Sequence, residues 1–217
     1  MKKKNLSNFT IFTNNKYFTL IAPMNFLAHI YLSGDNDFIK IGNFMADSIK
    51  GDHYNDYPEY IRKGILLHRS IDSFTDLHPV FRKSKHRLHE RYGHYSGVIM
   101  DIFYDHFLAK NWSKYNKIPL EKYVFNFYQL LEQHFDILTL RIQKMFPSMV
   151  RENWLLSYAS IEGLAKILYQ MDYRTKFNSK MQYATEELQL HYEEFEEEFT
   201  LFFEDIQKMA AEKIKND

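Results

Sequence analysis

Apolar residues recur every three or four positions along most of the chain after Met24, which is the spacing of amphipathic helices. Polar and glycine-containing segments such as Ser33-Gly34-Asp35-Asn36 interrupt this pattern and predict turns. We therefore expect helices over 25–32, from Phe38 to Gly51, from the end of the 52–58 loop to near His78, over 81–92, from Val98 to near Trp112, over 123–135, around Ile142 and Trp154, and over 161–170.

The C-terminal part has the most regular pattern. Its apolar residues follow one another at alternating intervals of four and three: Leu188, Tyr192, Phe195, Phe199, Phe202, Ile206 and Met209. This spacing predicts one long helix that packs lengthwise against its neighbours.

Composition supports a helical fold. The chain has 217 residues, enough for one sizeable core, and its 7 glycines and 5 prolines are too few for a many-stranded, turn-rich protein. We predict an all-α, single-domain helical bundle over residues 24–217. Residues 1–23 lack the helical periodicity and contain scattered polar residues, so we expect a poorly ordered N-terminal extension there.

Composition also excludes several classes of site. The absence of cysteine excludes disulfides, iron–sulfur clusters, zinc–thiolate sites and cysteine nucleophiles. No apolar run approaches the roughly 18 to 20 residues that span a bilayer. The net charge of zero gives no general reason to expect nucleic acid or an anionic membrane as a partner. We expect a cytoplasmic protein, and the sequence carries no signal for its oligomeric state.

Asp and His residues occur on the apolar faces of several predicted helices in the N-terminal half. His68 and Asp72 are four residues apart and so share one helix face, as do Asp101 and Asp105. Each residue alone is explained by a hydrogen bond in the core or on a helix surface. Burying several acids together without a cation would cost much desolvation energy, so jointly they predict a metal site. The candidate ligands are His29, Asp47, His68, Asp72, Asp101, Asp105 and His106.

Imidazole and carboxylate ligands without thiolate suit Mn²⁺, Mg²⁺, Fe²⁺ or Zn²⁺. Such a site with open positions activates water for attack on a phosphodiester. Asp47 and His68 are the predicted catalytic residues at the metal. Lys50 and Arg69 lie close to them in sequence and are the predicted contacts to the phosphate oxygens.

These residues also resemble those of a known family, the acyl carrier protein phosphodiesterases. The similarity covers roughly residues 24–112 in four blocks that keep their order and spacing. The blocks are Met24-Asn25-Phe26-Leu27-Ala28-His29, Gly42-Asn43 with Asp47 and Lys50-Gly51, Gly64-Ile65 with His68-Arg69, Ile71-Asp72, Phe74-Thr75-Asp76 and His78-Pro79, and Asp101 with Asp105-His106-Phe107-Leu108-Ala109 and Trp112.

The resemblance implies a divergent HD-domain phosphohydrolase that holds a divalent metal, usually manganese. It further implies hydrolysis of holo-acyl carrier protein to apo-acyl carrier protein and 4′-phosphopantetheine. The dyad Asp105-His106 reverses the His-Asp order that names the superfamily. Asp47, His68 and Asp105 are the preferred ligands, while His29 and Asp72 either bind the metal or orient its ligands.

An acidic carrier protein would need a basic surface on this otherwise neutral chain. A run on the fourth predicted helix supplies it: Arg82, Lys83, Lys85, Arg87 and Arg91. The alternative interpretation is a solvated helix face. The seven glutamates between Glu186 and Glu198 are interpreted as a solubilising surface.

Two other functions fit parts of this pattern. An enzyme of the same fold that acts on a nucleotide or another small phosphoester would keep the metal site without the docking surface. A metal-free helical binding protein would instead pair its acids with Arg69, Lys50 and nearby histidines.

Overall fold

All regular structure in the described part of the chain is helical. A computed structural model describes residues 26–216. The α-helices are α1 (Phe26–Leu32), α2 (Asp37–Met45), α3 (Glu59–Leu77), α4 (Pro79–Tyr92), α5 (Ser96–Lys110), α6 (Trp112–Tyr115), α7 (Leu120–Gln133), α8 (Leu140–Arg151), α9 (Trp154–Ser157), α10 (Ile161–Arg174), α11 (Ala184–Leu190) and α12 (Tyr192–Asn216). Short 3₁₀ turns are η1 (Ala46–Ser48), η2 (His53–Asp56), η3 (Gly93–Tyr95), η4 (Phe135–Ile137) and η5 (Met181–Tyr183). The all-α prediction is confirmed over this range, and the predicted extension 1–23 lies outside it.

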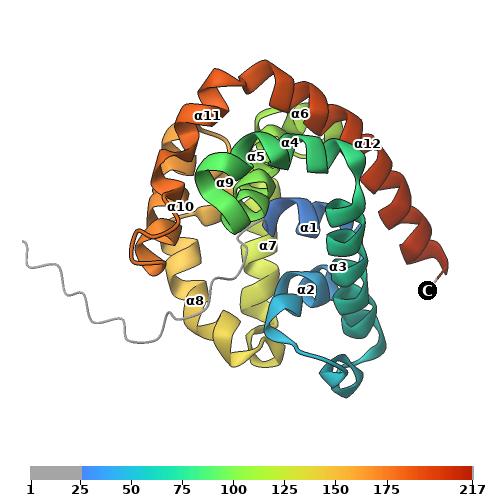
Figure 1. Cartoon of the computed structure of the whole chain (residues 1–217). Helices are drawn as coiled ribbons and strands as arrows, with labels where there is room; N and C mark the ends of the chain where they lie inside the picture. The colour runs from blue at the N-terminus through green and yellow to red at the C-terminus, as the bar shows by residue number, and fades with distance from the viewer. Residues whose placement is uncertain (1–25, 217) are drawn as a thin grey trace, which may run out of the picture.

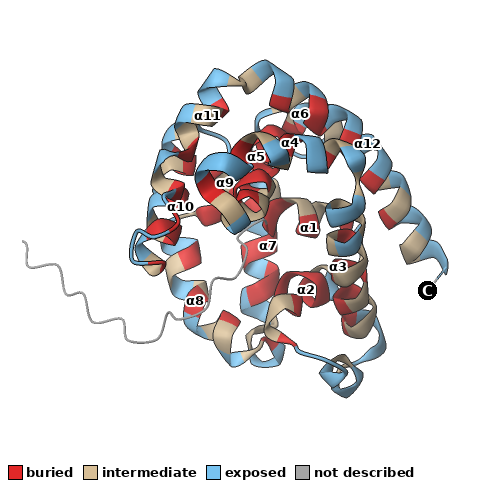
Figure 2. Ribbon diagram, in the orientation of Figure 1, coloured by how far each residue is buried: buried red, intermediate tan, exposed pale blue. Residues whose placement is uncertain are grey.

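The helices surround one hydrophobic core, with the short α1 in the interior (Figure 1). α1 packs against α2, α5 and α12, which come from the beginning, the middle and the end of the described chain. Buried residues lie on the inward faces and exposed residues on the outer faces (Figure 2). No helix within residues 26–216 is both long and apolar enough to cross a membrane.

Local sequence signals set several helix ends. The Asn36 side chain accepts hydrogen bonds from the backbone N–H groups of Phe38 and Ile39 and so caps α2. Pro79 occupies the first turn of α4, where its missing N–H costs nothing. Gly93 follows α4 with a positive φ of 53°, a conformation that glycine adopts readily.

Two predicted helix boundaries are wrong. The second helix ends at Met45 instead of Gly51, and the chain tightens into η1 before it turns away. The helix predicted to end near Trp112 ends at Lys110, and Trp112 begins the short α6. The predicted final helix is two helices, α11 and α12, separated at His191. The alternating apolar spacing of four and three residues continues across this break. Because the chain bends around the core there, Leu188 before the break and Phe195 after it are both fully buried.

Two glycines bring α2 and α3 into backbone contact. A Cβ atom at Gly42 would lie 2.1 Å from the carbonyl oxygen of Ile61, and one at Gly64 would lie 2.2 Å from that of Ile39. Only residues without a side chain allow helices to approach so closely. The contact matters for the site because Asn43 follows Gly42 directly, and His68 lies one turn after Gly64 on α3.

We predict that Gly64→Ala lowers the free energy of unfolding by about 1 to 3 kcal/mol or more, because this is the usual cost of overpacking a core. The new methyl group would meet backbone atoms, which no side-chain rotation can move away. Chemical denaturation would measure the loss. Gly97→Ala is the matched control, because its Cβ would meet only Lys85 Cδ, at 3.7 Å. Equal stabilities of the two variants would contradict the close crossing of α2 and α3.

Candidate metal centre

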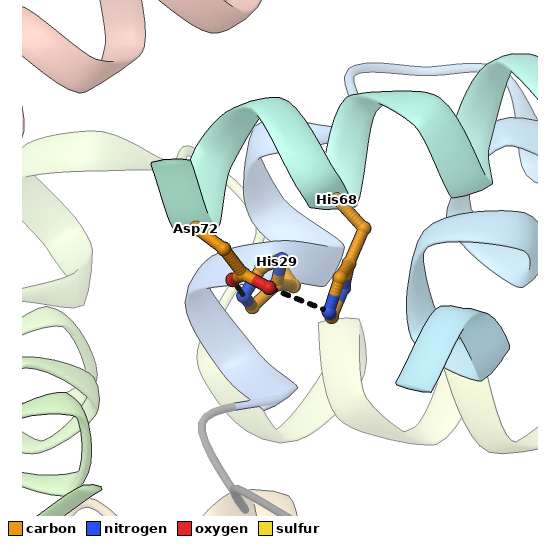
Figure 3. Close-up of side chains that lie close together, drawn as sticks. All are labelled: His29, His68 and Asp72. Carbon is orange, nitrogen blue, oxygen red and sulfur yellow. Dashed lines mark ion pairs between the residues drawn. The ribbon is translucent and has the colours of Figure 1, made fainter. Parts of the chain in front are cut away.

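Three of the predicted ligands converge between α1 and α3. His29 comes from α1, and His68 and Asp72 come from successive turns of α3 (Figure 3). One ligand atom from each lies within 4.8 Å of the other two. The two oxygens of Asp72 face one imidazole each, with Oδ1 3.3 Å from His29 Nε2 and Oδ2 3.2 Å from His68 Nε2. Both imidazoles are buried, whereas the Asp72 side chain is 47% exposed, so the group lies at the edge of the core.

Asn43 holds the two imidazoles from the opposite side. Its Oδ1 atom lies 2.9 Å from His29 Nδ1 and 3.0 Å from His68 Nδ1. The amide nitrogen donates to the His29 carbonyl and to Ser33 Oγ, both at 2.9 Å, which fixes the orientation of the amide. Because the amide oxygen only accepts, both Nδ1 atoms must carry hydrogens. Each Nε2 atom is therefore the ligand atom, and it points toward Asp72.

Asp47 brings a second carboxylate to the group. The early end of α2 places it in η1, where its Oδ1 lies 3.2 Å from His68 Nε2. Burial lowers the pKa of His68, but hydrogen bonds with Asp47 and Asp72 outweigh this effect and raise the pKa to about 9. Burial, together with the neighbouring His68, lowers the pKa of His29. Burial raises the pKa of Asp72, but its bonds to both histidines hold it well below the usual range.

This set of atoms fits a divalent cation. Two imidazole Nε2 atoms are held in the correct tautomer, and two carboxylates lie next to them. Such nitrogen and oxygen ligands, without thiolate, are those of Mn²⁺, Fe²⁺, Zn²⁺ and Mg²⁺ sites. Without a cation, the protonated His68 supplies the positive charge beside the two carboxylates.

Asp105 acts on the backbone of α1. Its Oδ2 accepts from Leu27 N–H at 3.0 Å and its Oδ1 from Ala28 N–H at 2.8 Å. These are N–H groups of the first helical turn, which have no partner inside the helix. Burial raises the pKa of Asp105 to about 7, and the two backbone hydrogen bonds oppose that rise. Asp105 thereby anchors the helix that carries His29.

Comparison with known proteins decides the family. A family model described as acyl carrier protein phosphodiesterase matches residues 24–206. The chain belongs to the acyl carrier protein phosphodiesterase family. The match extends well beyond the four N-terminal blocks and includes most of α12.

Individual relatives agree with this assignment. Three proteins named acyl carrier protein phosphodiesterase come from Photorhabdus laumondii, Pectobacterium atrosepticum and Yersinia pestis. They are 30%, 28% and 28% identical to this chain, over 88%, 86% and 88% of its length and 96%, 97% and 99% of theirs. No solved structure matches. The HD-domain relationship therefore stays a prediction.

Two predicted ligands of this family member do not belong to the group formed by His29, His68 and Asp72. His106 Nδ1 donates to the Tyr158 carbonyl, so its Nε2 accepts from the Tyr192 hydroxyl, each at 2.7 Å. Burial lowers the pKa of His106, which keeps it neutral. Asp101 lines the same cavity as Asp72, and burial, with Asp72 and Asp105 nearby, raises its pKa well above the usual range.

The predicted phosphate contacts lie beside the group. The Arg69 guanidinium donates to the Ile49 carbonyl at 3.2 Å and stacks over the Tyr54 ring. It therefore holds the segment that follows η1, next to Asp47. Lys50 is exposed to solvent. Their contact with a phosphate stays a prediction.

The basic run on α4 is partly paired with glutamates of the C-terminal helices. Two N–H groups of Arg87 bind both carboxylate oxygens of Glu198, at 2.5 and 2.7 Å, and Lys83 lies 3.0 Å from the same residue. Arg91 pairs with Glu186 and Glu187. Glu198 is only 5% exposed, so the interpretation of the glutamates as a solubilising surface is wrong for it.

The remaining basic residues of this run are less constrained. Arg82 is exposed, and Lys85 lies 3.8 Å from Asp76 on the side of α4 that faces α5. The pairing reduces the net positive charge of the predicted docking surface. Carrier-protein docking on the run stays a prediction.

Sequence reasoning missed Asn43 as a functional residue, although it lies in one of the four blocks. The sequence signal was an amide side chain between apolar residues of α2. The structure shows that this position is fully buried. A buried amide must bond all its polar atoms, so such a position predicts a network. Only the fold shows that the partners are the two histidines.

Proposed function

We propose that the protein is a metal-dependent phosphodiesterase that hydrolyses holo-acyl carrier protein to apo-acyl carrier protein and 4′-phosphopantetheine. Membership of the family supports this function, as do the relatives that carry its name. The structural observation that supports it most strongly is the group of His29, His68 and Asp72, in which both imidazole Nδ1 atoms are hydrogen-bonded to the Asn43 amide oxygen. The acidic partner and the absence of a membrane helix in the described range agree with a cytoplasmic enzyme.

The ligand set that we propose is His29, His68 and Asp72, with Asp47 as the fourth residue. A divalent cation, most favourably Mn²⁺, would supply Lewis acidity to the phosphodiester and lower the pKa of an attacking water. The protein's own contribution is geometric. Asn43 fixes the imidazoles, Asp105 fixes α1, and Arg69 fixes the segment beside Asp47.

The reaction consumes one water. A bond forms between the water oxygen and phosphorus, and the bond between phosphorus and the serine oxygen of the carrier protein breaks. The attacking water gives up one proton, and the serine oxygen takes up one proton and becomes a hydroxyl, so the two transfers cancel. The phosphate leaves on the pantetheine. Asp101 lines the cavity together with Asp72, which makes it the residue that we propose to deliver this proton.

The direct test is incubation of the purified protein with holo-acyl carrier protein and Mn²⁺. Intact-protein mass spectrometry should show loss of the prosthetic group, and a chelator should abolish the loss until Mn²⁺ is restored. Nucleotides and a simple phosphodiester serve as competing substrates. Hydrolysis of a nucleotide with holo-carrier protein left intact would favour the small-phosphoester alternative, and full activity in chelator would exclude a metal enzyme.

A further inference from the structure

A cavity of about 430 Å³ opens beside the metal group. It lies between the C-terminal half of α3, α4 and the first turn of α5. Asp72, Asp76 and Asp101 line it with carboxylates, and Lys85, His89 and His94 bring nitrogen groups from α4 and η3. Its size lies within the range of roughly 300 to 1,000 Å³ that is usual for small-molecule pockets.

Lys85 is the permanently charged basic residue of this cavity. Its ammonium group lies over the Phe81 ring, 5.7 Å from the ring centroid, and 3.8 Å from the Asp76 carboxylate, and its Cδ atom lies beside Gly97. The side chain is 33% exposed, and its contacts with Phe81 and Asp76 hold the charge at the cavity wall. Lys85 and Asp72 line the same cavity. An anion bound next to the metal group would therefore meet a positive charge there.

The other large cavity has a different position. It has a volume of about 820 Å³ and is lined by residues such as Asp35, Lys40, Lys117 and Gln133. None of His29, Asp47, His68 and Asp72 lines it. A ligand in that cavity would not touch the metal group, so the larger volume does not make it the reactive pocket.

We propose that the 430 Å³ cavity receives the 4′-phosphopantetheine arm of the carrier protein, with Lys85 bound to its phosphate. This inference rests on the proposed function and identifies the substrate pocket of the same site. The cavity is too small for any folded domain but suits an extended arm. Its mixed walls, with Phe81 and Val98 beside Thr75 and Ser96, suit a ligand that alternates methyl groups with amides and hydroxyls.

Gly97 offers a way to fill the cavity without damage to the backbone. It lies in the first turn of α5, lines the cavity, and a Cβ there would meet only Lys85 Cδ. A leucine side chain at this position would project into the space that the arm needs. Replacing a helical glycine also favours the helix, so Gly97→Leu should fold.

The test compares binding and turnover in the Mn²⁺-loaded protein. Calorimetric titration with free 4′-phosphopantetheine and with pantetheine, which lacks the phosphate, reports on the pocket itself. Gly97→Leu should weaken the binding of both ligands and lower kcat/KM toward holo-carrier protein at least 100-fold. Gly97→Ala should have an intermediate effect.

Lys85→Gln should weaken the binding of the phosphorylated ligand about tenfold or more, which is the usual effect of losing a charge-assisted hydrogen bond. It should leave the binding of pantetheine unchanged. Lys122→Gln on the exposed face of α7 is the control for loss of a lysine and should change neither titration.

The outcomes separate this inference from the proposed function. Cleavage of holo-carrier protein by the wild type tests the function alone. If the wild type is active and Gly97→Leu, with unchanged metal content, is equally active, the pocket assignment is overturned and the function stands. If Gly97→Leu does not fold, the Lys85 comparison decides, because equal loss of both ligands or of neither would refute a phosphate contact.

Discussion

Asp72→Asn should lower the hydrolysis of holo-acyl carrier protein by about 10³-fold or more, because the metal contributes several kcal/mol of transition-state stabilisation. Asp72 is the carboxylate that touches both imidazole Nε2 atoms. The substitution keeps the size of the side chain and removes the negative charge that a divalent cation needs. Metal content by mass spectrometry and steady-state kinetics would measure the effect together.

Asp105→Asn is the matched control for this experiment, since it removes the same charge from a second buried acid. Asp105 bonds the backbone of α1, and an amide has only one acceptor oxygen for the two N–H groups. We therefore expect a loss of about 1 to 3 kcal/mol in stability, with the metal stoichiometry of the folded protein retained. Loss of the metal at unchanged stability would instead make Asp105 a ligand, as the sequence predicts.

Asn43→Leu should weaken metal binding by about 10- to 100-fold, as expected when the group that orients ligating histidines is removed. Leucine is similar in size but accepts no hydrogen bond, so both Nδ1–H groups would lose their partner in the core. The His29 carbonyl and Ser33 Oγ would lose their donor as well. Titration of the metal-free protein with Mn²⁺ would give the affinity.

Asn43→Asp distinguishes positioning from general destabilisation. It keeps an acceptor oxygen for the two imidazoles and loses the amide donor, so we expect metal affinity between those of the wild type and Asn43→Leu. Imidazole ¹⁵N chemical shifts would report the tautomers, with Nδ1 protonated in the metal-loaded wild type and a mixture in Asn43→Leu. If stability falls in both variants while affinity and tautomers stay as in the wild type, Asn43 has only a structural role.

The sequence by itself determined the helices and the chemistry of the ligands. Apolar spacing predicted most helices, since burial of one face depends on periodicity that is visible along the chain. The spacing of His68 and Asp72 placed both on one face of α3, and the structure brings them to one point. The lack of cysteine left only nitrogen and oxygen ligands.

Ion pairing across the fold was decided by the tertiary structure. Arg87 and Glu198 are 111 residues apart, and nothing in their local sequence indicates that they meet. The sequence predicts the basic run as a docking surface, with a solvated helix face as the alternative, and the glutamates as a solubilising surface. The packing of α12 against α4 brings the two together. Burial of Glu198 is stable there because Arg87 binds both of its oxygens.

Which predicted ligands share a site was also decided only by tertiary structure. His106 lies in the same motif as Asp105, yet its two nitrogens bind Tyr158 and Tyr192. His29 and His68 meet because α2 and α3 touch at Gly42 and Gly64, which lets Asn43 reach both rings. Periodicity gives the face of a helix on which a residue lies, but not the neighbour that the face meets. That neighbour depends on how the helices cross. The crossings are set jointly by the side-chain volumes of residues that lie far apart in the sequence.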